Sequence, residues 1–434
     1  MIRPKDFISS HRNLLVALLG ASAWTAHEWV RGWLFSGFGW NGLGVALHHN
    51  WPLIQISEFT GVAGLSFAVV FTNVIAVCIP LRLVAETRTH RMRPHFDLTL
   101  TMIGLIALFA FGLHAVQNPS AAKSLRVAAL QTNIAQTAKL HADNPEQVFN
   151  ICDQLSALAV QREPDLGLIV WPESSIPGIL GRDAWVLQFP QTIAQRSGTD
   201  LLLGVDNEEN DRDYNAALLV SPAGESQLYR KVHLVPFGEY VPLRHSFPLF
   251  AAIANTWVPG DFAAGTEHIV FHLTKRDVQV APLICFEDTV GDLVRYFVLN
   301  GANLLVDITN DGWFLQSAGS EQHLANAIFR CVENRRPMVR AANTGVTCFI
   351  DEFGRFVQAT SHIPNETGQP AKRVQDDTGS TFTEGVLTGV INLPADSTLT
   401  FYTRHGEWFA ECCAGITAIA IILALVWRRL GRGD

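Results

Sequence analysis

Long apolar runs without a charged residue lie near both ends of the chain. Residues 59–81, 98–122 and 412–427 contain no Asp, Glu, Lys or Arg. A helix needs roughly 20 mostly apolar residues to cross the hydrocarbon core of a membrane, with about 17 as a lower limit. The third run reaches that length when Phe409 and Ala410 are included. The pattern therefore predicts three membrane-spanning helices.

A shorter apolar run, residues 13–26, is followed by His27, Glu28 and Arg31 and then by an aromatic-rich stretch up to Trp51. We interpret this run as a fourth span whose far end enters a polar site. A basic start and an apolar run also fit a secretory signal peptide, but no clear small-residue cleavage site follows. The predicted spans lie near residues 13–34, 59–81, 97–117 and 408–427.

Three clusters of basic residues fall on the same side of the predicted spans. Because basic loops stay in the cytoplasm, the region between the third and the last span is predicted to lie across the membrane. The predicted organisation is an N-terminal membrane region at 1–117 with about three spans, a domain at 118–405, and a C-terminal helix with a basic tail at 406–434. The basic clusters are Arg3, Lys5 and Arg12; Arg82, Arg88, Arg91 and Arg93; and Arg428, Arg429 and Arg432.

The region between the apolar ends has the pattern of an α/β domain. Short β-branched runs have strand character, and residues 144–161 and 288–300 predict helices. Residues 352–354 fit a hairpin turn, and the polar residues 362–380 fit a surface insertion or flexible loop. The predicted strands cover residues 125–130, 166–171, 201–205, 216–220, 278–284 and 304–308.

Composition narrows the class of protein further. The 434 residues are 48% hydrophobic and only 17% charged, with a net charge of −8. This balance excludes a disordered chain and argues against a nucleic-acid partner. The seven cysteines show no CxxC spacing and the fifteen histidines no HExxH spacing, so neither a disulfide framework nor a metal site is predicted. Phosphate-binding glycine loops are also absent from the sequence, and no cofactor is expected.

Three segments each deliver a reactive side chain at the predicted end of a strand. Residues 169–177 place Glu173 directly after Trp-Pro. Residues 229–240 contain Lys231 and Glu239, and residues 281–288 contain Cys285 and Glu287. Each residue alone has an ordinary structural explanation, because a single Cys at a strand end is usually a small buried hydrophobe. The three segments in this order are what indicates a catalytic site.

A cysteine nucleophile could be built from this set. A thiol attacks as its thiolate, which a helix N-terminus and a nearby ammonium such as Lys231 would favour. Glu173 could take the thiol proton, and Lys231 could stabilise the oxyanion of a tetrahedral intermediate. Glu239 and Glu287 could orient Lys231 or hold Glu173 in the required protonation state.

The order Glu173, Lys231, Cys285 resembles the Glu-Lys-Cys triad of the nitrilase superfamily. Within that superfamily, the sequence is similar to the membrane-embedded branch, the apolipoprotein N-acyltransferases. The resemblance covers roughly residues 20 to 428, and it includes membrane motifs that a soluble nitrilase would lack. The matching motifs lie at residues 28–40, 59–67, 127–134, 236–242, 310–314 and 336–345.

The resemblance implies an α-β-β-α sandwich flanked by transmembrane helices, in a bacterial inner membrane with the catalytic domain on the periplasmic side. It implies Cys285 as nucleophile, Glu173 as general base, Lys231 as oxyanion stabiliser, and Glu239 and Glu287 as supporting residues. The implied reaction moves an acyl chain from a phospholipid to Cys285 as a thioester. The amine of a diacylglyceryl-cysteine apolipoprotein then takes that chain as an amide.

Two other functions stay open on the sequence alone. The same triad would serve a membrane-tethered amidase or carbon–nitrogen hydrolase in which water replaces the amine. A non-catalytic lipoprotein-binding relative is the third possibility, because family members usually have several more spans before residue 28. The sequence also departs from the family at Leu140, where a Trp is common, and at Phe286, where a Tyr is common. Residues 241–265 fit a lid against the bilayer or a packed surface loop equally well, and the oligomeric state stays open.

Overall fold

The computed structural model describes residues 9–90, 93–117, 121–134, 145–242, 244, 260–394 and 398–430. The chain divides into two compact units. The first unit combines residues 1–119 with 400–434, and the second is formed by residues 120–399. Lys139, Leu140 and most of the possible lid at 241–265 lie outside the described residues.

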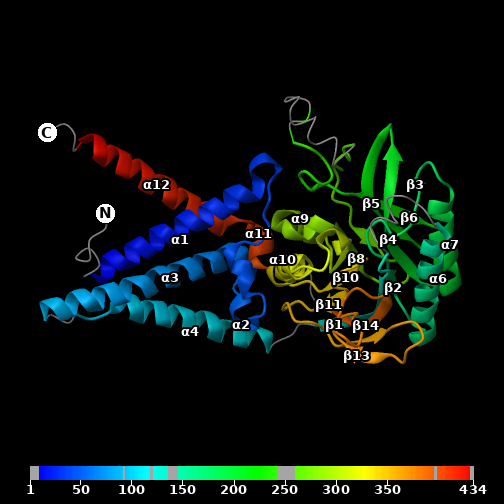
Figure 1. Cartoon of the computed structure of the whole chain (residues 1–434), viewed down its shortest axis with the longest axis horizontal. Helices are drawn as coiled ribbons and strands as arrows, with labels where there is room; N and C mark the ends of the chain where they lie inside the picture. Colours follow the sequence, from blue (N-terminus) through cyan, green and yellow to red (C-terminus); the bar gives the residue numbers. More distant parts are fainter. Residues whose placement is uncertain are drawn as a thin grey trace. The chain divides into compact units, whose positions relative to one another are not determined.

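The elements that the structure describes in the first unit are helices (Figure 1). Three of the described helical stretches are long and apolar enough to cross a membrane, namely Ser57–Arg88, Phe96–Val116 and Trp408–Leu430. They confirm that helices of membrane-spanning length and composition lie at the three predicted runs. The elements are α1 (Ser10–Trp33), η2 (Leu34–Ser36), η3 (Leu43–Leu47), α2 (Trp51–Ile54), α3 (Ser57–Thr89), α4 (Phe96–Val116), α11 (Phe401–His405) and α12 (Trp408–Leu430).

Helix α1 corresponds to the shorter apolar run. It is one helix of 24 residues, and it packs on α3 and α12. Its buried positions include the small residues Ala17, Ala21 and Ser22, which let helices approach closely. Its role as a fourth span stays a prediction.

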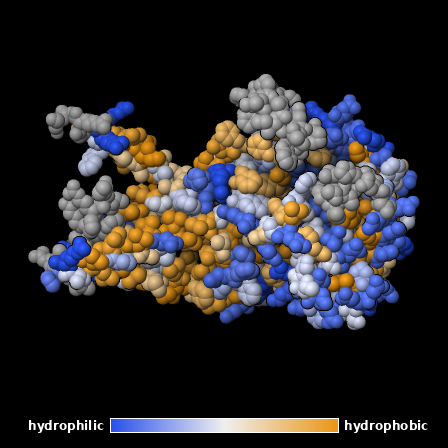
Figure 2. Space-filling view, in the orientation of Figure 1, coloured by the Kyte–Doolittle hydropathy of each residue, from blue (hydrophilic) through white to orange (hydrophobic). Residues whose placement is uncertain are grey.

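The outward faces of these helices are apolar over long stretches (Figure 2). Ile106 of α4 and Leu423 of α12 are each 63% exposed. A continuous exposed apolar surface of this kind is typical of a protein that is covered by lipid. The first unit therefore has the character of a membrane protein.

Glu28 is a polar residue of α1 that makes structural hydrogen bonds. Its Oε1 accepts hydrogen bonds from the backbone N–H of Leu43 at 2.7 Å and from Trp24 Nε1 at 2.8 Å. It therefore ties the loop after α1 back onto the helix. An ionisable residue in a membrane segment indicates function by default, but here the hydrogen bonds of Glu28 explain its presence.

Arg82 belongs to a buried ion cluster of the first unit. Its Nε lies 2.8 Å from Glu86 and its NH1 3.2 Å from Asp97, and all three side chains are at most 1% exposed. Asp97 also accepts a hydrogen bond from Asn13 at 2.6 Å, so the cluster joins α1, α3 and α4. Arg82 is thus an ion-pair partner inside the helix bundle rather than a free charge in the loop between spans.

Two sheets form the centre of the second unit, as described for residues 121–394. The larger sheet has nine strands in the order β13-β12-β14-β1-β2-β4-β5-β6, with β3 paired to β4 at the side. The smaller sheet has the order β11-β10-β9-β8-β7. Contacts of β1 with β10 and of β5 with β8 bring the sheets face to face, while α6 and α7 cover the larger sheet and α9 packs on β8. The predicted α-β-β-α sandwich is confirmed.

The strands are β1 (Ala121–Gln131), β2 (Leu168–Val170), β3 (Ile179–Leu180), β4 (Asp200–Glu209), β5 (Arg212–Val220), β6 (Ser226–Arg230), β7 (Phe271–His272), β8 (Gln279–Ile284), β9 (Leu304–Thr309), β10 (Met338–Ala342), β11 (Cys348–Ile350), β12 (Ala359–His362), β13 (Gln369–Ala371) and β14 (Gly385–Pro394). The helices are α6 (Pro145–Arg162), α7 (Trp185–Ser197), η4 (Cys285–Thr289), α9 (Gly291–Leu299), η5 (Asp311–Phe314) and α10 (Gly319–Asn334).

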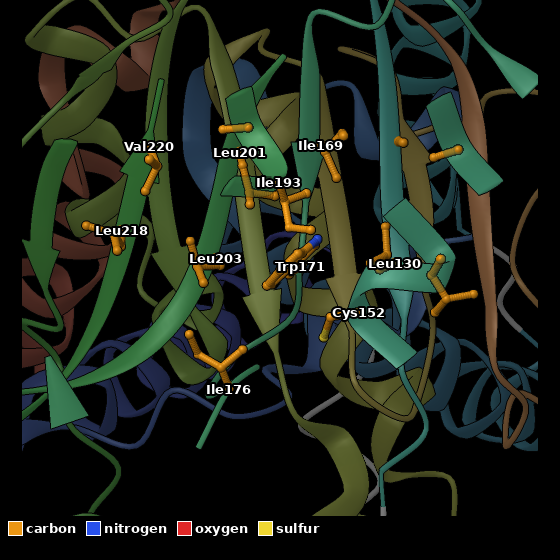
Figure 3. Close-up of a cluster of buried hydrophobic side chains, with 14 of the residues drawn as sticks. Leu130, Cys152, Ile169, Trp171, Ile176, Ile193, Leu201, Leu203, Leu218 and Val220 are labelled. Atoms are coloured by element: carbon orange, nitrogen blue, oxygen red, sulfur yellow. The ribbon is translucent and has the colours of Figure 1, made fainter. Parts of the chain in front are cut away.

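The core under α6 and α7 is built from alternate residues of neighbouring strands (Figure 3). Leu201 and Leu203 of β4, Leu218 of β5 and Trp171 belong to this cluster, and each side chain is at most 2% exposed. Burial of such a side chain stabilises the fold by roughly 1.5–3 kcal/mol. The indole Nε1 of Trp171 donates to Ser156 of α6 at 3.0 Å. This contact anchors the chain two residues before Glu173.

The predicted strands are all present, and α6 matches the predicted helix at 144–161. The prediction for residues 362–380 is wrong in part. His362 ends β12, and residues 369–371 form β13, which pairs with β12 as the edge of the larger sheet. A polar sequence can form an edge strand because one side of it faces water, so the apolar pattern does not reveal it.

Candidate active site

The three predicted catalytic residues lie together in the second unit. Glu173 follows β2, Lys231 directly follows β6, and Cys285 directly follows β8. Lys231 Nζ lies 3.9 Å from Glu173 Oε1. The charges of Glu173 and Lys231 both act on the pKa of Cys285, so the thiol lies within electrostatic range of both.

The backbone around Glu173 is fixed by β4. Gly204 N–H donates to Pro172 O at 3.1 Å, and Ser175 N–H donates to Gly204 O at 2.9 Å. A Cβ at position 204 would lie only 2.5 Å from the Cα of Glu173, so this close approach requires glycine. Ser174, the next residue, has a φ of 44°, which turns the chain sharply after the carboxylate. Glu173 is therefore held by backbone geometry rather than by its side chain alone.

Lys231 is a buried cation, 1% exposed, with carboxylates on two sides. Its Nζ donates to Glu239 Oε1 at 2.8 Å. Burial opposes the charge of the ammonium, but Glu239, Glu173 and Cys285 outweigh burial and raise the pKa of Lys231. The residue therefore carries a fixed positive charge beside the thiol.

Asn215 joins the two carboxylates, and the sequence analysis missed it. Its Nδ2 donates to Glu173 Oε1 at 2.7 Å and to Glu239 Oε1 at 2.9 Å. Asn215 is 4% exposed and lies on β5, where its backbone O accepts from Lys231 N–H at 2.8 Å. The only sequence signal for it is a polar residue at the start of the buried run 216–220.

Glu287 lies beside Cys285 in the chain but contacts other groups. Its Oε1 accepts from Tyr229 OH at 2.8 Å and from the backbone N–H of Val232 at 2.8 Å. Its Oε2 accepts from Ile284 N–H at 3.0 Å. Burial raises the pKa of Glu287 to about 7, against the opposing effect of Lys231 and these donors. Glu287 thus links the turn that carries Cys285 to the segment that carries Lys231.

Cys285 sits on a strained turn. It has a φ of 53°, in the left-handed region that non-glycine residues adopt mainly at functional sites and turns. The residue as a whole is partly exposed. The short η4 turn begins at Cys285, and the helix α9 starts only at Gly291.

The expectation that a helix N-terminus favours the thiolate is therefore wrong. Val290, between η4 and α9, has the extended angles φ −102° and ψ 95°, which separate Cys285 from the helix. Burial and the nearby charges of Glu173 and Asp311 raise the pKa of Cys285, although Lys231 acts in the opposite direction. The resting thiol is neutral, so it needs a base at the moment of attack.

Among the described residues, no group of three or more His, Cys, Asp or Glu side chains is arranged to hold a metal ion. The chemistry available to the site is that of a thiol, two carboxylates, an ammonium and an amide. This set suits nucleophilic attack on an acyl group with general-base assistance.

Each of the two units contains residues that match a known protein family. Residues 126–378 match the carbon-nitrogen hydrolase family, and residues 5–75 match the apolipoprotein N-acyltransferase N-terminal domain. The apolipoprotein N-acyltransferase of Geobacter metallireducens is 34% identical over 94% of this chain and 73% of its own length. That of Chlorobaculum tepidum is 32% identical over 96% of this chain and 78% of its own.

The solved structures that this chain resembles are more distant in sequence. A carbon-nitrogen hydrolase from Helicobacter pylori G27 is 14% identical, with a TM-score of 0.44, and covers 66% of this chain and 94% of its own. The two matched sequence families and the full-length relatives together identify the protein at the level of family. The chain belongs to the apolipoprotein N-acyltransferase family, within the carbon-nitrogen hydrolase superfamily.

Proposed function

We propose that this protein transfers an acyl chain from a phospholipid to the N-terminal amine of a diacylglyceryl-cysteine apolipoprotein, through a thioester on Cys285. The observation that carries the proposal is the polar cluster beside the thiol. Lys231 lies between Glu173 and Glu239, and Asn215 fixes both carboxylates. Family membership and the three membrane-length helices indicate a lipid context for that cluster.

In the first half-reaction, the neutral thiol attacks the ester carbonyl of the phospholipid. The S–H proton passes to Glu173 as the sulfur bonds to the carbonyl carbon. The carbonyl oxygen becomes negative and accepts a hydrogen bond from Lys231. Collapse of the intermediate breaks the bond to the glycerol oxygen. That oxygen takes the proton from Glu173 and leaves as lysophospholipid.

In the second half-reaction, the neutral amine of the apolipoprotein attacks the thioester carbonyl. Glu173 takes a proton from this amine, and Lys231 again stabilises the negative oxygen. The C–S bond then breaks, and the departing sulfur recovers the proton from Glu173. The product is an amide, and Cys285 is again a neutral thiol.

The proposed location is a bacterial inner membrane with the second unit on the periplasmic side. The argument is the distribution of basic residues around the spans. Arg88, in the last turn of α3, and Arg93, between α3 and α4, support it as exposed cations. Arg82 does not contribute, because it is neutralised inside the helix bundle.

Mass spectrometry of the purified full-length protein tests this function. After incubation with phospholipid in mixed micelles, we expect an acyl mass on the peptide that contains Cys285. Addition of a lipopeptide with a free α-amine should move that mass to the lipopeptide. Cys285→Ala should show no acyl mass at this peptide, whereas Cys412→Ala, which removes an exposed cysteine of α12, should behave like the unchanged protein.

Two results would contradict the proposal. An acyl product that forms equally well in Cys285→Ala would exclude the thioester. Release of free fatty acid without transfer to the lipopeptide would indicate a hydrolase instead.

A further inference from the structure

Thr309 lies next to Cys285 across two paired strands. In the parallel pair β8–β9, Ile284 is opposite Ile308, so the residues that follow them lie side by side at the same end of the two strands. These next residues are Cys285 and Thr309. Thr309 is fully buried, and its side chain is a hydrogen-bond partner that lowers the pKa of the Cys285 thiol.

The Thr309 hydroxyl has a second partner on its other side. Its Oγ1 donates to Asp311 Oδ1 at 3.1 Å. A hydroxyl has a single hydrogen, so while this hydrogen goes to the carboxylate it is not donated to the sulfur. If the sulfur becomes negative, the hydroxyl can turn its hydrogen toward the sulfur, because an ionised acceptor makes the stronger bond.

Asp311 is itself held by a buried network that the proposed reaction does not use. His323 Nδ1 lies 2.7 Å from Asp311 Oδ1, and Arg340 NH2 lies 3.3 Å from Asp311 Oδ2. His323 Nε2 also lies 3.0 Å from Asp288, three residues after Cys285. All four side chains are at most 1% exposed. The network fixes Asp311 as an ionised acceptor and connects it to the turn of the nucleophile.

We propose that Thr309 is a further catalytic residue whose hydroxyl donates a hydrogen bond to the Cys285 sulfur while that sulfur carries negative charge, and that Asp311 is the positioning residue that holds the hydroxyl there. This inference rests on the proposed function, since negative charge builds up on the sulfur when it attacks the ester and when it leaves the thioester. No bond to Thr309 is made or broken.

The other groups near the sulfur do not supply this interaction. Glu173 and Asp311 are negative and oppose a thiolate, and Lys231 favours it by charge. Lys231 is also engaged by Glu239 and is assigned to the carbonyl oxygen during the reaction. A neutral donor directly on the sulfur therefore complements Lys231 rather than duplicating it.

The pH dependence of Cys285 alkylation tests this proposal without any acyl substrate. Iodoacetamide labelling of the Cys285 peptide is followed by mass spectrometry in the full-length protein. Thr309→Val keeps the shape and removes the donor, so the labelling midpoint should move up by about 1 pH unit, the worth of one hydrogen bond to a charged group. Thr309→Ser keeps the donor and should leave the midpoint unchanged.

Asp311→Asn should move the same midpoint in the opposite direction. It removes a negative charge near the sulfur, so labelling should begin at lower pH. Opposite shifts in Thr309→Val and Asp311→Asn support the proposal. An unchanged midpoint in Thr309→Val, with normal thermal unfolding, overturns it. If Asp311→Asn fails to fold, the Val and Ser variants of Thr309 decide alone.

These results are separable from the proposed function. If the unchanged protein shows no acyl transfer while Thr309→Val moves the labelling midpoint as expected, the acyltransferase reaction is rejected and the role of the Thr309 hydroxyl is kept. If the unchanged protein transfers the acyl group but Thr309→Val does not move the labelling midpoint, the role of Thr309 is rejected and the reaction is kept. In Thr309→Val we also expect transfer from preformed acyl-enzyme to slow about tenfold, because the sulfur leaves without its donor.

Discussion

Glu173 affects the Cys285 thiol in two opposing ways. As a neighbouring negative charge it raises the pKa of the thiol, and in the proposed reaction it is the base that accepts the thiol proton. A neutral resting thiol is protected from alkylation and oxidation, because the thiolate is the reactive form. The carboxylate therefore keeps the sulfur unreactive until a substrate carbonyl is in place.

Glu173→Gln should separate these two effects. The pKa of Cys285 should fall when the negative charge is removed, so iodoacetamide labelling should begin at lower pH. Acyl-enzyme formation should nevertheless drop at least about 100-fold, because the base is lost. Lys231→Met is the matched variant, in which loss of the positive charge should move labelling to higher pH. A Gln variant that keeps both the original labelling midpoint and the original acylation rate would reject the assignment of Glu173.

Asn215 is the residue on which the positions of both carboxylates depend. Asn215→Ala should slow acyl-enzyme formation by about 10- to 100-fold, since a hydrogen bond to a charged group is worth roughly 1.5–3 kcal/mol. Asn207→Ala is a suitable control, because Asn207 is a buried amide of the neighbouring strand β4 that bonds the backbone O of Leu180. Single-turnover acylation measures both variants. Equal rates in the two would show that Asn215 is only structural.

At the scale of elements, the site is assembled by loops that leave strands of two sheets. β2 and β6 belong to the larger sheet, and β8 and β9 to the smaller one. The packing of β5 on β8 joins the two sheets beside these loops. The relative position of base and nucleophile therefore depends on how the sheets pack, not on either loop alone.

Gly204→Ala tests this dependence on strand packing. The added Cβ would meet the Glu173 backbone, so the loop that carries the base should shift. A displacement of about 1 Å can reduce a rate about 100-fold, and we expect a loss of that order in acylation. Gly260→Ala, where the added atom meets nothing within 4 Å, should have no effect. Full activity in Gly204→Ala would show that Glu173 does not need this position.

The sequence predicts the strands well and some of the site poorly, for physical reasons. Buried strands such as β2 and β8 are largely apolar runs, and Glu173 and Cys285 follow their ends. Asn215 and Thr309 were missed because their roles depend on which strand lies beside which. The helix predicted at residues 288–300 is present but starts three residues later, at Gly291, because the residue before it, Val290, is extended. Polar edge strands such as β13 carry no apolar signal.

At the scale of the whole molecule, the chain combines a unit of apolar helices with a unit that carries the chemistry. In the first unit, the buried ion cluster at Arg82 joins three helices in an environment where unpaired charge is unfavourable. We therefore expect the stability of the helix bundle to depend on this cluster.

Arg82→Leu should destabilise the protein strongly. It would leave Glu86 and Asp97 buried without their cation, and removal of one partner from a buried pair typically costs about 3–5 kcal/mol. Thermal unfolding in detergent measures the effect, with Arg88→Leu as a control at an exposed position of the same helix. Equal melting temperatures for the two variants would contradict a structural role for the cluster.

The central claim is that Cys285 holds the acyl chain between two separate substrates. A chase experiment on isolated acyl-enzyme tests it most directly. The protein is loaded from phospholipid, freed of lipid by gel filtration in detergent, and mixed with an amine-bearing lipopeptide alone. We predict that one acyl group per enzyme passes to the lipopeptide while the mass on Cys285 disappears. If acylated lipopeptide forms only when phospholipid is present again, the sulfur is not the carrier and this mechanism is contradicted.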